Sequence, residues 1–207
     1  MNKPAVNLHP IHDLLKNRWS PRAFSSQPVE KDHLLSLFEA ARWAPSGSNL
    51  QPWAFIVTTS ADPEPHARLV AALAEFNQMW AKDAPVLVLA VVQREREPGK
   101  PNPYATYDLG QSVAHLSVQA TNLGLLVHQM AGFDHQKARE AVNLPEGFDP
   151  VTVFTIGYPG NAADLPERLR ERELAPRARK PLSEFVFDGA WNVALDKNPE
   201  LEAAPGD

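Results

Sequence analysis

Two arginine pairs, far apart in the chain, have the side chains and spacing needed to hold an anion. Arg18 and Arg22 flank Ser20 in the run RWSPR, and Arg177 and Arg179 alternate in the run RARK. Guanidinium groups and a hydroxyl bind phosphate through charge-assisted hydrogen bonds, and the proline of the first run would keep its backbone rigid. Each run alone is also compatible with an exposed basic turn or a solvated charged face. Together they indicate one anionic ligand held by distant parts of the chain, and a phosphate-bearing cofactor is the natural candidate.

Several other kinds of site are not supported by the sequence. It contains neither G-x-G-x-x-G nor G-x-x-x-x-G-K-[ST], so the phosphate would not lie in a Rossmann or P-loop site. The seven histidines are scattered without H-x-H or H-E-x-x-H, so no metal site is expected. Asp108, Ser112 and His115 would share one helical face, but three residues on a straight helix rarely give the geometry of a nucleophile triad. We expect these polar groups to bond to neighbouring elements instead.

A polar run, WAPSGSNLQPW over residues 43–53, connects a helical pattern to a strand-like one. Its hydroxyl and amide groups lie on a proline-limited turn flanked by two tryptophans. Such a surface can hydrogen-bond the edge of a planar heterocycle. The alternative is an ordinary helix-to-strand connection that uses Pro, Gly and Asn as turn residues.

Composition sets the broad class of the protein. With 207 residues, 43% hydrophobic and 22% charged, we expect one globular domain over residues 1–207. A net charge of -5 argues against a nucleic-acid binder, which needs a basic surface. The chain has no cysteine, which excludes disulfides and thiolate metal sites and suits the cytoplasm. The longest apolar run, residues 86–92, is too short to span a membrane, and no signal-peptide pattern opens the chain.

Hydrophobic periodicity predicts alternating helices and strands. Helices are expected over residues 11–16, 30–44, 65–82, 104–123 and 136–142, and strands over residues 53–59, 86–92, 125–130 and 151–158. The charged, proline-rich residues 93–104 predict an exposed loop or a short lid. Residues 192–207 predict an extended or frayed acidic tail. The element pattern alone indicates an α/β or α+β protein with a single sheet and does not give the strand order.

The ordered set of motifs resembles the FMN-dependent nitroreductase family over residues 11–191. The matching segments are RWSPRAF, ARWAPSGSNLQPWAFIV, FNQMWAKDAPVLVLAVV, QMAGF, GYPG and PRARKPLSEFV. The resemblance implies an α+β fold with a central, mostly antiparallel sheet wrapped by helices, in an interlocked homodimer with two FMN sites at the subunit interface. It implies that NAD(P)H passes a hydride through bound FMN to a small acceptor such as a nitroaromatic or a quinone, in ping-pong order. Other branches of this fold dehalogenate, dehydrogenate or break down flavin, and a non-catalytic FMN-binding protein is a further alternative.

The resemblance also assigns roles to residues of this chain. Arg18, Ser20, Arg177 and Arg179 match phosphate ligands, with Trp19 in the same cofactor-binding segment. Arg22 matches the basic residue beside the N1 and C2 carbonyl side of the ring, where it could stabilise reduced flavin. The remaining ring contacts are Asn77 at the pyrimidine edge, Met130, Ala131 and Gly132 against the ring near N5, and Pro45, Ser46, Gly47 and Asn49 from the partner chain.

Three positions depart from residues seen in other members of the family. Arg22 stands where many members have lysine, Trp80 where some have a second lysine, and Ala131 where some have an acidic residue. No dedicated side-chain acid or base is expected. The resemblance leaves open the physiological acceptor and the choice between NADH and NADPH.

Overall fold

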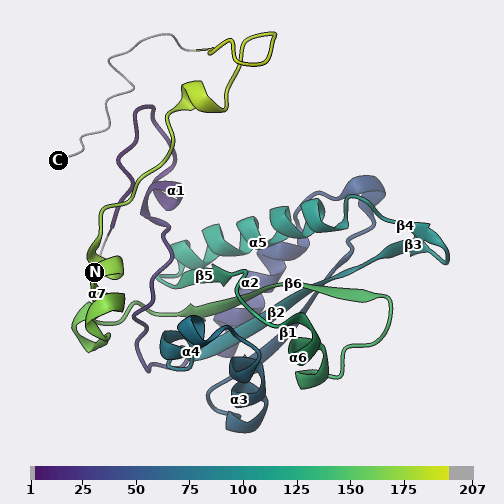
Figure 1. Ribbon diagram of the computed structural model, residues 1–207, viewed down its shortest axis with the longest axis vertical. Helices are drawn as coiled ribbons and strands as arrows, with labels where there is room; N and C mark the ends of the chain where they lie inside the picture. Colours follow the sequence, from purple (N-terminus) through teal and green to yellow (C-terminus); the bar gives the residue numbers. More distant parts are fainter. Residues whose placement is uncertain (1–2, 196–207) are drawn as a thin grey trace.

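A four-stranded antiparallel sheet forms the centre of the fold. The computed structural model describes residues 3–195 (Figure 1). The strands lie in the order β1 (Trp53–Thr59), β2 (Val86–Gln93), β6 (Phe148–Gly157) and β5 (Leu126–Met130), and every neighbouring pair is antiparallel. This confirms the predicted α+β class and the mostly antiparallel sheet.

Helices cover both faces of the sheet, as Figure 1 shows. On one face lie α2 (Lys31–Arg42) and α5 (Ala105–Asn122), and on the other lie α3 (Pro63–Ala71), α4 (Glu75–Ala81) and α6 (His135–Ala141). Because both faces are covered, β2 is buried from Val86 to Val92, which explains its continuous apolar run. Alternate residues of β2 therefore enter two separate cores.

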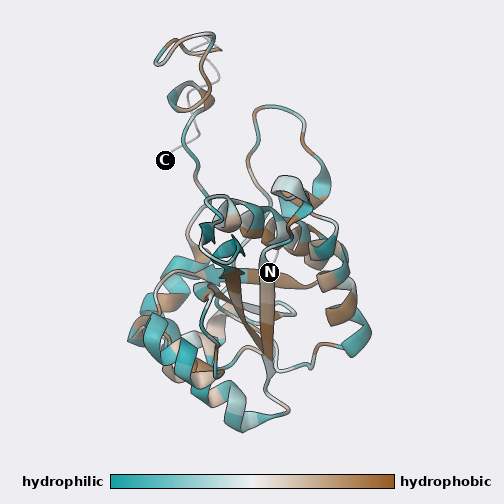
Figure 2. Cartoon of the chain, turned by 90° about the vertical axis from the view of Figure 1, so that its right-hand side faces the viewer, coloured by the Kyte–Doolittle hydropathy of each residue, from teal (hydrophilic) through white to brown (hydrophobic). Residues whose placement is uncertain are grey.

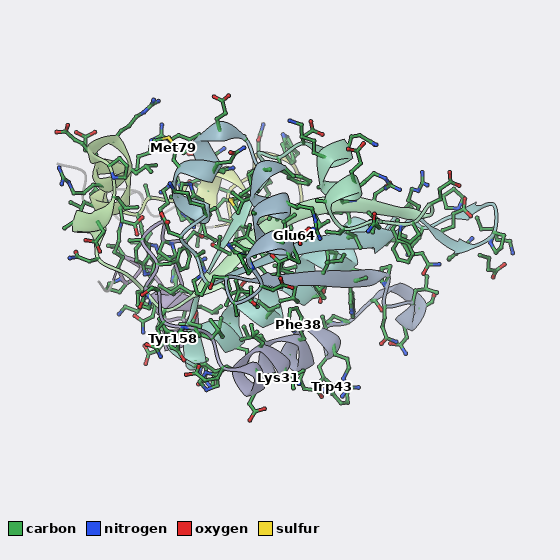
Figure 3. The ribbon with its side chains drawn as sticks, turned by 90° about the horizontal axis from the view of Figure 1, so that it is seen from below. Lys31, Phe38, Trp43, Glu64, Met79 and Tyr158 are labelled. Carbon is green, nitrogen blue, oxygen red and sulfur yellow. The ribbon has the colours of Figure 1, made fainter. Side chains whose placement is uncertain are left out.

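The two cores follow from the amphipathic helices packed against them. Figure 2 shows hydrophobic strands enclosed by helices whose outer surfaces are polar. Figure 3 shows Phe38 of α2 lying against the sheet, while Lys31 and Trp43 project outward. Phe38 packs on Phe55 of β1, with ring centroids 5.3 Å apart. Trp43, which follows the last residue of α2, is 71% exposed. Leu37 and Ala41, two other apolar residues of the predicted helix, are buried.

One predicted helix is in fact two. The apolar periodicity predicts a single helix over residues 65–82, but the chain leaves helical geometry between α3 and α4. There the backbone of residues 72–74 pairs with residues 132–134: Ala74 N–H donates to Gly132 (2.9 Å), and Asp134 N–H donates to Ala72 (2.7 Å). A tertiary pairing replaces intrahelical bonds at this point, and periodicity carries no signal for it.

The first and last segments that the structure describes lie together at one end of the sheet. Helices α1 (Asp13–Asn17) and α7 (Glu167–Leu174) lie there, and the chain after α7 runs beside the N-terminal segment and away from the body (Figures 1 and 2). The sequence indicated a charged, proline-rich segment here rather than α7. Of the predicted tail, residues 192–195 turn back to pair with residues 186–188, and residues 196–207 lie outside the described part of the chain.

The predicted loop at residues 93–104 is an exposed hairpin. Its strands are β3 (Glu95–Glu97) and β4 (Lys100–Pro101), and it extends from the end of the sheet opposite α1 and α7 (Figure 1). In the described part of the chain, no helix has the length and apolar character needed to cross a membrane.

Candidate anion and cofactor site

The two arginine runs meet in the folded chain, as their spacing predicted. Arg18 Nη1 donates to Ser20 Oγ (3.2 Å), and Arg177 Nη1 donates to the Lys16 carbonyl (3.0 Å). Burial lowers the pKa of Arg18, and the nearby cations Arg177 and Arg179 lower it further. Within residues 3–195 none of these three arginines forms an ion pair with a carboxylate. Three neighbouring cations without a counter-charge form a site that an anion would stabilise.

Arg22 lies beside this cluster with part of its side chain buried. Its backbone N–H donates to both carboxylate oxygens of Glu173, at 3.0 and 2.9 Å. Its Nε is buried and has no hydrogen-bond partner among the described residues. Burial lowers the pKa of Arg22, Glu173 opposes that shift, and Arg172 adds to it. A buried donor without a partner is costly, so a ligand atom that accepted from it would be favoured.

Sequence reasoning missed His128, which lies under the RWSPR run. Its Nδ1 donates to the Pro21 carbonyl at 2.7 Å, and its ring packs on Trp80 with centroids 4.5 Å apart. Burial, opposed by the hydrogen bond to Pro21 and assisted by the charges of Arg22 and Arg18, lowers the pKa of His128 to about 4. The ring is therefore neutral at neutral pH. The local sign was the polar pair His128 and Gln129 between the apolar residues of β5.

The neutral state of His128 predicts acid sensitivity of the FMN-free protein. The unfolded chain binds this proton near its ordinary pKa of 6.5, and the folded chain only near pH 4. The free energy of unfolding therefore falls as pH drops through this window, by about 3 kcal/mol from this group. Urea unfolding at pH 7, 5.5 and 4.5 measures the fall. His128→Asn, which keeps a donor for Pro21, should show a shallower pH dependence, and equal slopes in the two proteins would contradict the assignment.

Residues 131–132, which follow β5, contact α4. Asn77 Nδ2 donates to the Gly132 carbonyl at 3.0 Å, and Ala131 and Gly132 are exposed while Met130 is buried. A Cβ added at Gly132 would lie 3.0 Å from that amide nitrogen, so a larger residue there would require the Asn77 side chain to shift by a few tenths of an ångström. An open pocket of about 550 Å³ adjoins Ala131 and Gly132, and its other walls are residues 71–75, Gln78, Phe133, Asp134 and Lys137.

The polar run at residues 43–53 is a strained turn, held mainly by α5. Gly47 N–H donates to Asp108 Oδ2 at 3.1 Å, and Gln51 N–H donates to Ser46 Oγ at 3.0 Å. Ser48, Asn49 and Gln51 have positive φ, at 51°, 55° and 48°. Such backbone geometry in non-glycine residues costs about 1 kcal/mol or more each and is concentrated at functional sites.

The three polar residues that share one face of α5, Asp108, Ser112 and His115, have separate structural environments. Asp108 bonds to Gly47, Ser112 Oγ donates to the Ala41 carbonyl at the end of α2 (3.1 Å), and His115 is exposed. The polar groups of α5 therefore fasten the end of α2 and the turn after it. Among residues 3–195, no group of three or more potential ligand side chains is placed to hold a metal ion.

Within one chain the turn and the arginine cluster lie at opposite ends of the sheet. The turn leads into β1 at Trp53, which pairs with Val92 near the start of β6. The RWSPR run leads to Phe24, which bridges to Pro159 just beyond the end of β6. Ten residues of β6 separate these ends, which is about 30 Å. The exposed Pro45, Gly47 and Asn49 thus cannot contact a ligand held by the arginines of the same chain.

The remaining assigned residue, Trp19, is buried at 5% exposure, and Lys3 Nζ lies 5.1 Å from the centre of its ring. The structure therefore brings Arg18, Ser20, Arg22, Arg177 and Arg179 into one part of the molecule. Asn77 of α4 contacts Gly132, which follows β5. Trp80, also on α4, packs on His128.

Known proteins match both the sequence and this fold. A solved structure described as an oxidoreductase containing FMN superposes with a TM-score of 0.84 at 37% identity, covering 89% of this chain and 94% of that one. A Rhodopseudomonas palustris protein, provisionally named NADH dehydrogenase/NAD(P)H nitroreductase, is 29% identical over 163 residues, 69% of this chain and 81% of the relative. Iodotyrosine deiodinase 1 of Rattus norvegicus is 26% identical over 188 residues, 78% of this chain and 66% of the relative.

The fold and these relatives define the class of the protein as that of the FMN-dependent oxidoreductases. The profile of the nitroreductase family matches residues 15–158, which is more than half of the sequence. The chain belongs to the nitroreductase family.

Proposed function

We propose that this protein binds FMN and uses it to transfer reducing equivalents from NADH or NADPH to a small acceptor such as a nitroaromatic or a quinone. The observation that carries the proposal is the cluster of Arg18, Arg177 and Arg179, which lacks a carboxylate partner among the described residues. Bound FMN would supply the hydride chemistry, accepting from the nicotinamide and donating to the acceptor in ping-pong order. The proposal includes a cytoplasmic location. A chain without cysteine forms no disulfides and therefore needs no oxidising compartment.

The residues of this chain fit FMN at both ends of the ligand. Arg18, Ser20 and Arg179 would hold the phosphate, because Arg18 contacts Ser20, the charge of Arg179 acts on Arg18, and no described carboxylate pairs with either arginine. Arg22 would place a cation beside the ring and favour the negative charge of the reduced form. Asn77 and the exposed backbone of Ala131 and Gly132 would orient the ring, and the neutral ring of His128 adds no competing charge.

We further propose a homodimer in which each site takes its turn residues from the partner. The separation of about 30 Å within one chain supports this, since Ser46 and Asn49 can contact the flavin only from another subunit. Exposed apolar side chains also support a subunit interface: Leu35, Trp43, Tyr104 and Tyr107 on or near α2 and α5, and Phe185 and Trp191 after α7. The hairpin at residues 93–104 shares the end of the sheet with the turn, so it would lie near the partner's site as a lid.

A second candidate function is reductive dehalogenation. It is favoured by the similarity to iodotyrosine deiodinase 1. The same flavin site would serve both reactions, and the acceptor would differ. Comparing the turnover of a halotyrosine with that of a nitroaromatic and a quinone, all with the same reductant, separates the two.

Purification tests the proposal directly. We expect a yellow protein that retains FMN and loses its absorbance near 450 nm when NADH or NADPH is added without oxygen. Acceptor should then restore the absorbance. A colourless protein that cannot be reconstituted with FMN would rule out both flavin functions. A yellow protein that neither nucleotide bleaches would retain the binding function and lose the oxidoreductase function.

A further inference from the structure

Glu173 is a buried carboxylate whose oxygens are used by backbone groups of the RWSPR run. It lies in the last turn of α7 at 2% exposure. Oε1 accepts from Arg22 N–H (3.0 Å) and Ala23 N–H (3.1 Å), and Oε2 accepts from Arg22 N–H (2.9 Å). A buried carboxylate is stable only when such donors surround it, so these three contacts fix both the side chain and the backbone at Arg22.

The same segment holds the other side of the run through Arg177. Its Nη1 donates to the carbonyls of Lys3 (2.6 Å) and Lys16 (3.0 Å). Lys3 Nζ in turn donates to the carbonyls of Glu173 (2.5 Å) and Ala175 (2.6 Å). The residues from Lys16 to Arg22, which carry Arg18 and Ser20, are therefore fastened at both ends to residues 173–177.

The charges explain why a carboxylate is tolerated beside an anion site. Burial lowers the pKa of both Lys3 and Arg22, and the negative charge of Glu173 opposes that shift in each, so its charge faces those cations. Among the described residues, Glu173 forms no ion pair with Arg18, Arg177 or Arg179. Its negative charge thus offsets the crowding of cations around Arg22, while Arg18 and Arg179 keep their positive potential for a ligand.

We propose that Glu173 is a positioning residue that assembles the phosphate site by fixing the backbone at Arg22, with Arg177 as the second support of the same run. The inference rests on the proposed binding of FMN. It gives Arg177 a structural task, because its Nη1 is already bonded to two carbonyls. Arg18, Ser20 and Arg179 remain to contact the phosphate.

Comparing FMN with riboflavin isolates this role, because riboflavin has the same ring and lacks the phosphate. We expect Glu173→Gln to weaken FMN binding by roughly tenfold, the loss of about one charge-assisted hydrogen bond. Riboflavin binding should fall by a smaller factor than FMN binding, because Arg22 is the one ring contact on this run, and the others, Asn77, Ala131 and Gly132, come from other segments. Glu171→Gln, with the same charge change at an exposed position of α7, is the matched control and should bind FMN as the unaltered protein does.

Glu173→Asp keeps the charge and shortens its reach, so it tests the role if the glutamine variant does not fold. It should show the same selective loss of FMN affinity. Unchanged FMN affinity in the variants, or equal losses for FMN and riboflavin, would overturn the positioning role. If the unaltered protein binds neither flavin, the proposed function itself fails. If it binds both equally, the phosphate site fails while flavin binding stands.

Discussion

Arg18→Ala should weaken FMN binding more than any other single removal from the arginine cluster. Arg18 is the central cation: it lies against Ser20, and the charges of both Arg177 and Arg179 act on it. Loss of its hydrogen bonds to a phosphate should cost about 2–3 kcal/mol, or roughly 30- to 150-fold in the dissociation constant. Fluorescence titration of FMN with the apoprotein measures the change.

The control for Arg18→Ala is Arg68→Ala. Arg68 is an exposed arginine of α3 that pairs with Glu64 at 2.7 Å, so its removal makes the same change in net charge away from the cluster. FMN affinity should stay within about twofold in this variant. Riboflavin affinity should be little changed in both variants. An Arg18→Ala protein that holds FMN as tightly as the control would refute the phosphate role.

The strands and the arginine cluster were the parts most accessible from sequence. β1 begins and ends at the predicted residues, because Pro52 and the polar run before it mark its start clearly. β2 was recognised as a buried central strand from its unbroken apolar residues. The arginines were recognised by chemistry, since alternating guanidinium groups around a serine have a distinctive use. These features are local in sequence, and their physical causes act over a few residues.

What the sequence did not reveal depends on contacts between distant segments. The break between α3 and α4 exists because residues 72–74 pair with residues 132–134. Glu173 looked like one charge of a solvated face, and its role depends on the backbone of Arg22, 151 residues away. The signal available in the sequence was the four-residue spacing of Leu169 and Glu173, which places them on one face of a helix. In the structure both residues are buried, so this face is the inner face of α7.

The proposed division of one site between two chains leads to the prediction with the largest effect. Arg18→Ala damages the phosphate half of a site. Gly47→Trp should block the turn half, and its own chain accepts a Cβ at this exposed position: that atom would lie 3.8 Å from Asp108 Oδ2, an ordinary contact. Each variant alone forms a homodimer in which both sites are defective. We expect each to lose most of its bound FMN.

A heterodimer of the two variants should recover one full site. In a two-fold symmetric dimer, one site would combine both defects, and the other would combine the unaltered arginines of the Gly47→Trp chain with the unaltered turn of the Arg18→Ala chain. Co-expression with two different affinity tags isolates this heterodimer, and absorbance gives its FMN content. We expect about one FMN per dimer, with NAD(P)H oxidation restored in proportion.

If each site were built within a single chain, both sites of the heterodimer would be damaged, so a colourless heterodimer would refute the shared site. Because the sheet holds the turn and the arginines about 30 Å apart, recovery in trans is the result that this fold requires if both segments bind one flavin.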